Sequence, residues 1–375
     1  MSTVFSFHMA TTDRFTWLKL TREVSSPSAA HEYPPDVFFK THLGISFTRL
    51  FVFLAVGAAI TDYLLVGNPD TGIPYNYPLY VGLLYIIAVL FALRKFHAIF
   101  DGAKQELLTI LERTTADNAM FERESDITPA DINREVNDVM DTAFSPIVIL
   151  GGGFLGGIFS LAVMWLLDVF HYFPYLTMNY AYGAGHGFFY GPIIGSVYLI
   201  YKVSSEYIVD IDVLDPDGVG GYGDIGDAII DVIILGIILV TLDFIILSSV
   251  TFIDEPLFQA AVFGLYALML LTLLGLAVFG VMRIRKRLLE IREGKTERMR
   301  EAFKAVEERY WEKLDRGESP HPEADHIETM DTMFNRLHSM ELWPINLASL
   351  SRLAVSVGSS GAIALYQAGY ISIPV

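Results

Sequence analysis

The sequence predicts an all-α polytopic membrane protein with seven transmembrane helices. Two observations support this fold class. Of the 375 residues, 53% are hydrophobic, which exceeds the hydrophobic content of typical soluble domains. In addition, seven segments stay apolar over the roughly 20 residues that a helix needs to cross a bilayer. These segments cover about residues 45–66, 78–95, 145–170, 183–202, 227–252, 257–282 and 345–372.

The basic residues of the predicted loops indicate the orientation. Lys and Arg lie before the first segment and after the second, fourth and sixth segments, whereas the opposite loops 67–77, 171–182 and 253–256 contain neither. Because short cytoplasmic loops carry an excess of Lys and Arg, we expect the N-terminus in the cytoplasm. The odd number of spans then places the C-terminus outside. The expected location is the plasma membrane, with the lipid bilayer as a partner.

This topology divides the chain into four parts. Within the bundle we expect a cytoplasmic helical insert at 99–143 and an acidic, Gly-rich loop at 203–226. The four parts are a cytoplasmic N-terminal segment (1–44), a six-helix transmembrane bundle (45–283), a cytoplasmic helical anchor (284–344) and the seventh helix (345–375).

The insert and the anchor carry helix signals of their own. In the insert, we expect Thr128 to cap a helix that starts at Pro129, with Asp131 bonding back to the cap. In the anchor, the sixth span is expected to continue as a charged helix to about residue 316. An amphipathic helix at 324–342 follows, and we expect a neighbouring subunit or the insert to cover its apolar side. That side carries Ile327, Met330, Phe334, Leu337 and Met340.

The formal net charge is −17, although the predicted inner loops are basic. An acidic surface stays hydrated in concentrated salt, so we interpret the charge as a sign of a halophilic, archaeal source. A partner-binding or cation-attracting surface is the alternative. The chain has no cysteine, which excludes disulfides, thiolate metal sites and cysteine nucleophiles.

Polar residues recur at three- and four-residue steps along the seventh segment, so a helix would carry them on one side. Such a side suits either a water-filled path or a close helix–helix contact. In the first case these residues line a pore, and Pro344 is the gating hinge. We expect Arg352 to pair with Glu341 or with an aspartate of 210–231. The polar residues are Ser349, Arg352, Ser356, Ser360 and Gln367.

The fourth segment carries glycines at strict four-residue spacing, which favours close packing against another helix. Three rings lie between them and are candidates for a ligand pocket, with simple packing as the alternative. The glycines are Gly183, Gly187, Gly191 and Gly195, and the rings belong to Tyr182, His186 and Tyr190.

Asp243 lies near the middle of the fifth segment. A carboxylate at that depth costs about 2.5–3.5 kcal/mol on insertion scales. We expect either a proton or sodium site of a transporter, or a hydrogen bond to a neighbouring helix. In the preceding loop, aspartates could form a tight turn or bind a divalent cation, but the positions of the EF-hand pattern are not matched. These aspartates are Asp210, Asp212, Asp215 and Asp217.

No HExxH or GxSxG motif is present, so we expect neither an enzyme nor a bound cofactor. The expected partners are further copies of the chain and, as a candidate for gating, a small-molecule ligand; nucleic acid is not an expected partner.

The order of these elements resembles that of insect odorant and gustatory receptors. The resemblance is one of topology, and Leu365-Tyr366-Gln367 matches the terminal motif of that family only loosely. It implies a tetrameric, ligand-gated cation channel in which residues 345–372 line the pore and residues 284–342 join the subunits. We therefore predict a homo-oligomeric ion channel. A secondary transporter that uses Asp243 and a non-conducting signalling or effector subunit are the alternatives.

Overall fold

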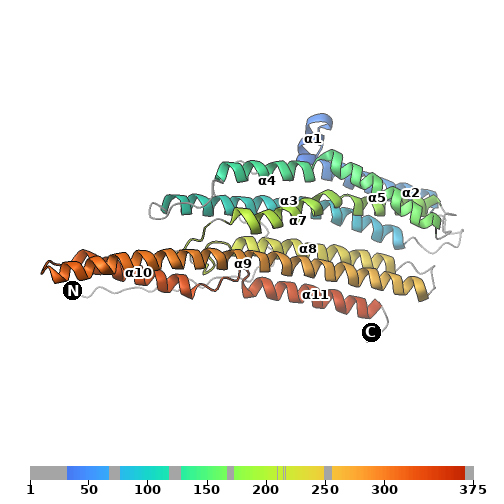
Figure 1. Ribbon diagram of the computed structural model, residues 1–375. Helices are drawn as coiled ribbons and strands as arrows, with labels where there is room; N and C mark the ends of the chain where they lie inside the picture. Colours follow the sequence, from blue (N-terminus) through green and yellow to red (C-terminus); the bar gives the residue numbers. More distant parts are fainter. Residues whose placement is uncertain are drawn as a thin grey trace, which may run out of the picture. The chain divides into compact units, whose positions relative to one another are not determined.

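The computed structural model describes residues 32–66, 77–117, 128–166, 173–208, 210–213, 215, 217–248 and 256–367. Within these ranges the chain forms helices and no β-strand, in agreement with the predicted all-α class (Figure 1). The helices are α1 (Pro34–Leu43), α2 (Phe47–Val66), α3 (Tyr77–Asp117), α4 (Pro129–Ala143), α5 (Pro146–Leu166), α6 (Phe173–Gly187), α7 (Tyr190–Lys202), the π-helical segment η3 (Val203–Tyr207), α8 (Gly223–Ser248), α9 (Pro256–Asp315), α10 (His321–Ser339) and α11 (Leu347–Gln367).

Several helices are long and apolar enough to cross a membrane. Among the described residues, four meet this condition, at 129–162, 223–246, 262–315 and 347–366. A fifth is added if α1 and the first part of α2 are counted as one bent span. The polytopic membrane character is therefore supported, whereas seven spans and the sides of the two termini remain predictions.

Two local predictions are confirmed. Helix α9 runs unbroken for 60 residues, from the apolar sixth segment into the charged anchor. Helix α4 begins with a capping box, in which the Thr128 side chain accepts from the Asp131 backbone and the Asp131 side chain accepts from the Thr128 backbone. Both features follow from short-range sequence signals that no tertiary contact overrides.

The predicted fourth span, 183–202, is not one helix. It is divided between the end of α6 and α7, with a turn at Phe188 and Phe189. Pro192 lies in the first turn of α7, where its missing N–H and its fixed backbone angle do no harm. Continuing α6 through Pro192 would instead cost a backbone hydrogen bond. The Phe189 backbone N–H turns back to the His186 carbonyl oxygen at 3.1 Å.

Close packing by the glycines is confirmed. A Cβ atom added to Gly187 would lie 2.5 Å from the Gly152 carbonyl carbon and 2.9 Å from the Gly153 nitrogen. One added to Gly156 would lie 3.0 Å from the Gly187 nitrogen. Helices α5 and α6 therefore touch backbone to backbone, which larger residues would prevent. Farther along, Gly195 faces the Ala143 side chain at the end of α4.

The apolar side of α10 packs within the same chain, on α9 and in a cluster that includes Ile132 of the insert, whereas contacts with a neighbouring subunit stay a prediction. Helix α10 packs on α9, and Leu337 is buried in a cluster that also contains Met299 of α9. The Lys313 ammonium lies 2.7 Å from the Glu323 carboxylate, and this hydrogen bond lowers the pKa of Glu323. Because α9 extends so far past its apolar segment, it offers α10 an internal partner.

Helix α8 lies at the centre of the contacts among the remaining helices. It contacts α3, α9 and α11, and its buried residues belong to all four hydrophobic clusters formed by the described residues. Polar side chains on α8 can therefore meet partners from several helices.

Candidate functional site

Asp243 of α8 is buried inside the bundle, with 5% of its surface exposed. Its Oδ1 atom lies 3.1 Å from Nε2 of His186, in the last turn of α6. The sequence indicated Asp243 and His186 as separate candidates, and the structure brings them together. A carboxylate that is costly in an apolar surrounding thus has an ionisable partner.

The second ring nitrogen determines the proton arrangement of His186. Nδ1 lies 3.0 Å from the Tyr182 backbone carbonyl oxygen, which can only accept a hydrogen bond. Nδ1 therefore carries a hydrogen and donates it to that oxygen. In a neutral imidazole the other nitrogen, Nε2, then bears only a lone pair. This nitrogen is the atom that faces Asp243.

Tyr85 of α3 completes the group. Its hydroxyl oxygen lies 3.1 Å from His186 Nε2, and its ring lies 5.1 Å from the imidazole and 5.2 Å from the Tyr182 ring, measured between centroids. Sequence reasoning missed Tyr85, although a tyrosine surrounded by Leu and Ile in an apolar run is a usable signal. Of the three predicted pocket rings, Tyr182 and His186 belong to this group. Tyr190 lies beyond the helix break and is 47% exposed.

The predicted polar side of α11 does not face water as a unit. Ser349 and Ser360 are buried, and Ser360 Oγ lies 2.5 Å from the Thr241 hydroxyl of α8 and is also bonded to the Tyr266 hydroxyl of α9. The expectation of a pore lining is thus not supported for these two serines within one chain. Hydroxyl partners on α8 and α9 hold Ser360 in a helix–helix contact, and the Ser349 hydroxyl accepts from the Arg352 guanidinium at 2.6 Å.

The other predicted lining residues differ in position. Ser356 is half-buried, and its hydroxyl donates to the Arg352 carbonyl oxygen at 2.9 Å. Arg352 pairs with Asp231 at 2.7 Å, so the expected partner from the 210–231 segment is confirmed. Gln367 ends α11, and its side chain lies outside the described residues.

Pro344, the predicted gating hinge, lies in a packed connection between α10 and α11. A Cβ atom added to Gly226 of α8 would lie 2.5 Å from the Pro344 carbonyl carbon. The Glu341 backbone N–H donates to the Gly218 carbonyl oxygen at 3.2 Å, and the Asn346 side chain donates to Asp227 at 2.7 Å. We call residues 340–346 the α10–α11 linker. It is held by the acidic loop and the start of α8.

The carboxylates of the acidic loop hold the loop itself. Asp217 accepts backbone hydrogen bonds from Val219, Gly221 and Gly223 at 2.8–3.0 Å, and Asp210 pairs with Lys295 at 2.5 Å. The Asp215 carboxylate accepts from the Asp217 backbone, and Asp212 bonds to Gly220 through its backbone. In the part of the chain that the structure describes, no three His, Asp or Glu side chains are placed to hold a metal ion. The tight-turn interpretation is therefore favoured over a cation site.

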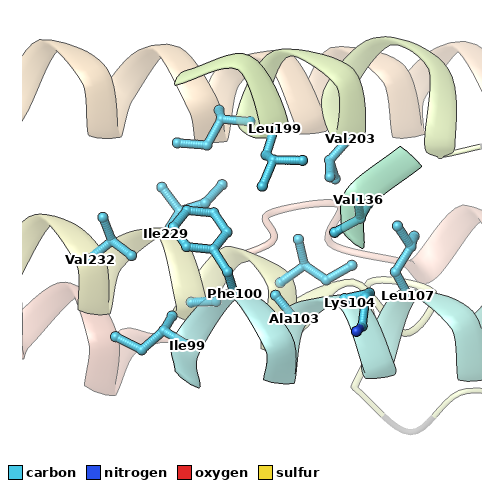
Figure 2. Close-up of a pocket in the computed structure, with 13 residues that line it drawn as sticks. Ile99, Phe100, Ala103, Lys104, Leu107, Val136, Leu199, Val203, Ile229 and Val232 are labelled. Atoms are coloured by element: carbon cyan, nitrogen blue, oxygen red, sulfur yellow. The ribbon is translucent and has the colours of Figure 1, made fainter. Parts of the chain in front are cut away.

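An apolar cavity lies between α3, α4, α7 and α8 (Figure 2). Lys104 is its charged lining residue, and its ammonium is bonded to Asp101 at 2.7 Å and to Asn137 at 2.9 Å. Helices α3 and α8 line this cavity and also carry Tyr85 and Asp243. Along α8, Val232 of the cavity lies three turns before Asp243. The lining residues are Ile99, Phe100, Ala103, Lys104, Leu107, Val136, Leu199, Ile200, Val203, Ile225, Ala228, Ile229 and Val232.

Comparisons of this chain with protein-family models, with curated proteins and with solved structures found no match.

Proposed function

We propose that this protein is a secondary transporter that couples the movement of a solute to the binding and release of a proton at His186 and Asp243. The observation that carries the proposal is the 3.1 Å contact between His186 Nε2 and Asp243 Oδ1 inside the bundle. Buried ionisable residues of membrane helices commonly serve proton relays and ion pathways.

The chemistry of the contact requires one proton. When a proton is present, it joins the two atoms, as imidazolium with carboxylate or as imidazole with carboxylic acid. Both arrangements have a net charge of zero. When the proton leaves, a carboxylate oxygen and a nitrogen lone pair face each other at hydrogen-bond distance, and both are acceptors. Proton release therefore turns an attraction between α6 and α8 into a repulsion.

The surroundings support a link between this change and movement. Helix α6 ends one residue after His186, and the turn formed by Phe188 and Phe189 follows, so α6 is not continuous with α7. Discontinuous helices beside a buried site are common in secondary transporters. The Tyr85 hydroxyl can donate to the Nε2 lone pair after the proton has left, which stabilises the deprotonated state.

The test uses proteoliposomes that contain a trapped pH-reporting dye and a proton gradient. They are exposed in turn to amino acids, sugars, organic cations, organic anions and inorganic ions. We expect at least one class to change the internal pH in the wild type and not in Asp243→Asn. Asp224→Asn is the matched control, since Asp224 is an exposed carboxylate in the first turn of the same helix. Equal responses from wild type and Asp243→Asn would contradict the proposal.

A homo-oligomeric, cation-conducting channel is the second candidate. The outward side of α11 favours it: a Cβ at Gly358 would have no described atom within 4 Å, and Ser351 and Ser359 are exposed. Further copies of the chain could assemble around this side. Single-channel recording in planar bilayers should then show conductance that Gly358→Trp blocks. Silent bilayers at all applied voltages would count against this candidate.

A further inference from the structure

We infer that α1 lies in the plane of the membrane interface and binds anionic lipid headgroups. The angle between α1 and the start of α2 is 76°, and Figure 1 shows α1 standing across the direction of the long helices. If α2 runs along the bilayer normal, α1 runs nearly parallel to the surface. With 10 residues, a helix is only about 15 Å long and cannot span the hydrocarbon core.

The inner side of α1 fixes this orientation. Tyr33, Asp36 and Phe39 are buried; the Tyr33 ring lies 6.0 Å from the Phe144 ring between centroids, and the Phe39 ring lies 5.4 Å from the Phe47 ring. Helices α2 and α5 therefore hold α1 in place. Its crosswise orientation is a packed feature of the structure.

The outer side of α1 has the pattern of an interfacial helix. Val37 and Phe38 are 39% and 44% exposed, and Lys40 and His42 lie on either side of them on the helix surface. Apolar side chains flanked by basic ones suit the boundary between headgroups and acyl chains, where the cationic ends reach the headgroups.

The position and charge of this surface specify the lipid. Asp36 of α1 lies 3.8 Å from Arg94, and Arg94 and Lys95 follow directly on the apolar run of α3. Helix α1 therefore lies at the level where this apolar run ends. Lys40, Arg49 and Arg94 are exposed, while the carboxylate of Asp36 is buried. The surface is thus basic and complements anionic headgroups.

The absence of cysteine from the chain permits a clean depth measurement. A nitroxide is attached to Phe38→Cys, with Phe53→Cys of α2 as the membrane reference and Trp311→Cys of α9 as the aqueous reference; both reference residues are exposed. Collision rates with oxygen and with a polar nickel chelate report depth in lipid vesicles. We expect the label at 38 to prefer oxygen over nickel, between the two references. A label at 38 that matches the one at 311 would overturn the interfacial orientation.

The lipid is tested by native mass spectrometry of the purified full chain, titrated with phosphatidylglycerol or phosphatidylcholine. Each basic residue near an anionic surface strengthens binding roughly fivefold. We expect preferential retention of phosphatidylglycerol, about 25-fold weaker affinity in the Lys40→Gln, Arg49→Gln double variant, and no change in the control Arg300→Gln, since Arg300 lies far along α9 and pairs with Glu297. Equal retention of the two lipids, or an unaffected double variant, would refute the headgroup preference.

Discussion

Replacement of Gly187 by Ala tests how closely α5 and α6 must approach. The added Cβ would lie 2.5 Å from the Gly152 carbonyl carbon and 2.9 Å from the Gly153 nitrogen, whereas carbon atoms in contact lie about 3.5–4.0 Å apart. The two helices must therefore separate by about 1 Å. Neighbouring backbone atoms cannot rotate away as a flexible side chain can, so the relaxation must involve whole helices.

The expected cost follows from this geometry. Overpacking costs about 1–3 kcal/mol, and a contact with backbone belongs at the upper end of that range. Alanine in place of glycine returns up to about 1 kcal/mol of helix propensity. The net loss of unfolding free energy is therefore about 2 kcal/mol. Because His186 precedes Gly187, the same separation also displaces the imidazole from Asp243.

Thermal unfolding of protein in lipid nanodiscs measures the effect. We expect the midpoint of Gly187→Ala to fall by about 2–3 °C. Gly275→Ala is the matched control, since Gly275 lies within helix α9 and its Cβ would have no described atom within 4 Å; its midpoint should stay or rise. The reasoning is refuted if Gly187→Ala is as stable as Gly275→Ala.

Three further changes give separate tests. Tyr85→Phe keeps the ring but removes the hydroxyl from His186 Nε2, so proton-coupled uptake in the proteoliposome assay should slow by up to about tenfold; an unchanged rate would contradict a role for this hydroxyl. Gly226→Ala forces the added Cβ against the Pro344 carbonyl and should speed limited proteolysis of the α10–α11 linker, whereas unaltered cleavage would argue against the contact. Lys104→Met removes a buried ammonium from two polar partners and should lower the unfolding free energy by about 3 kcal/mol. Thermal unfolding measures this loss, and a loss smaller than that of Gly187→Ala would contradict the expectation.

Local signals made much of the fold predictable. The helix start at Thr128, the unbroken α9 and the close-packing glycines each depend on residues within a few turns of one another. The Gly191-Pro192 pair indicated a break within the fourth span, but the position of the break at Phe188 was not predicted, because such a pair is compatible both with a kink and with a new helix. The internal contact between α10 and α9 was also missed, because an apolar helix side does not specify the element that covers it.

The candidate site shows the same limit. Asp243 and His186 each stood out as ionisable residues in apolar segments, but their pairing depends on how α6 and α8 pack. From the sequence, the serines of α11 could face either a water-filled path or another helix. Ser360 faces other helices, because it is bonded to the hydroxyls of Thr241 on α8 and Tyr266 on α9. Sequence periodicity tells which residues share a side, not what that side contacts.

Infrared difference spectroscopy during a pH titration of the membrane-reconstituted protein tests the shared proton most directly, since no substrate is needed. A protonated carboxyl group has its own C=O stretching band. If the pair binds a proton as proposed, at least one pH-dependent band, from the carboxylic acid or from the carboxylate paired with imidazolium, should disappear in Asp243→Asn and change in His186→Gln. Identical difference spectra for the wild type and both variants would contradict proton exchange at this site.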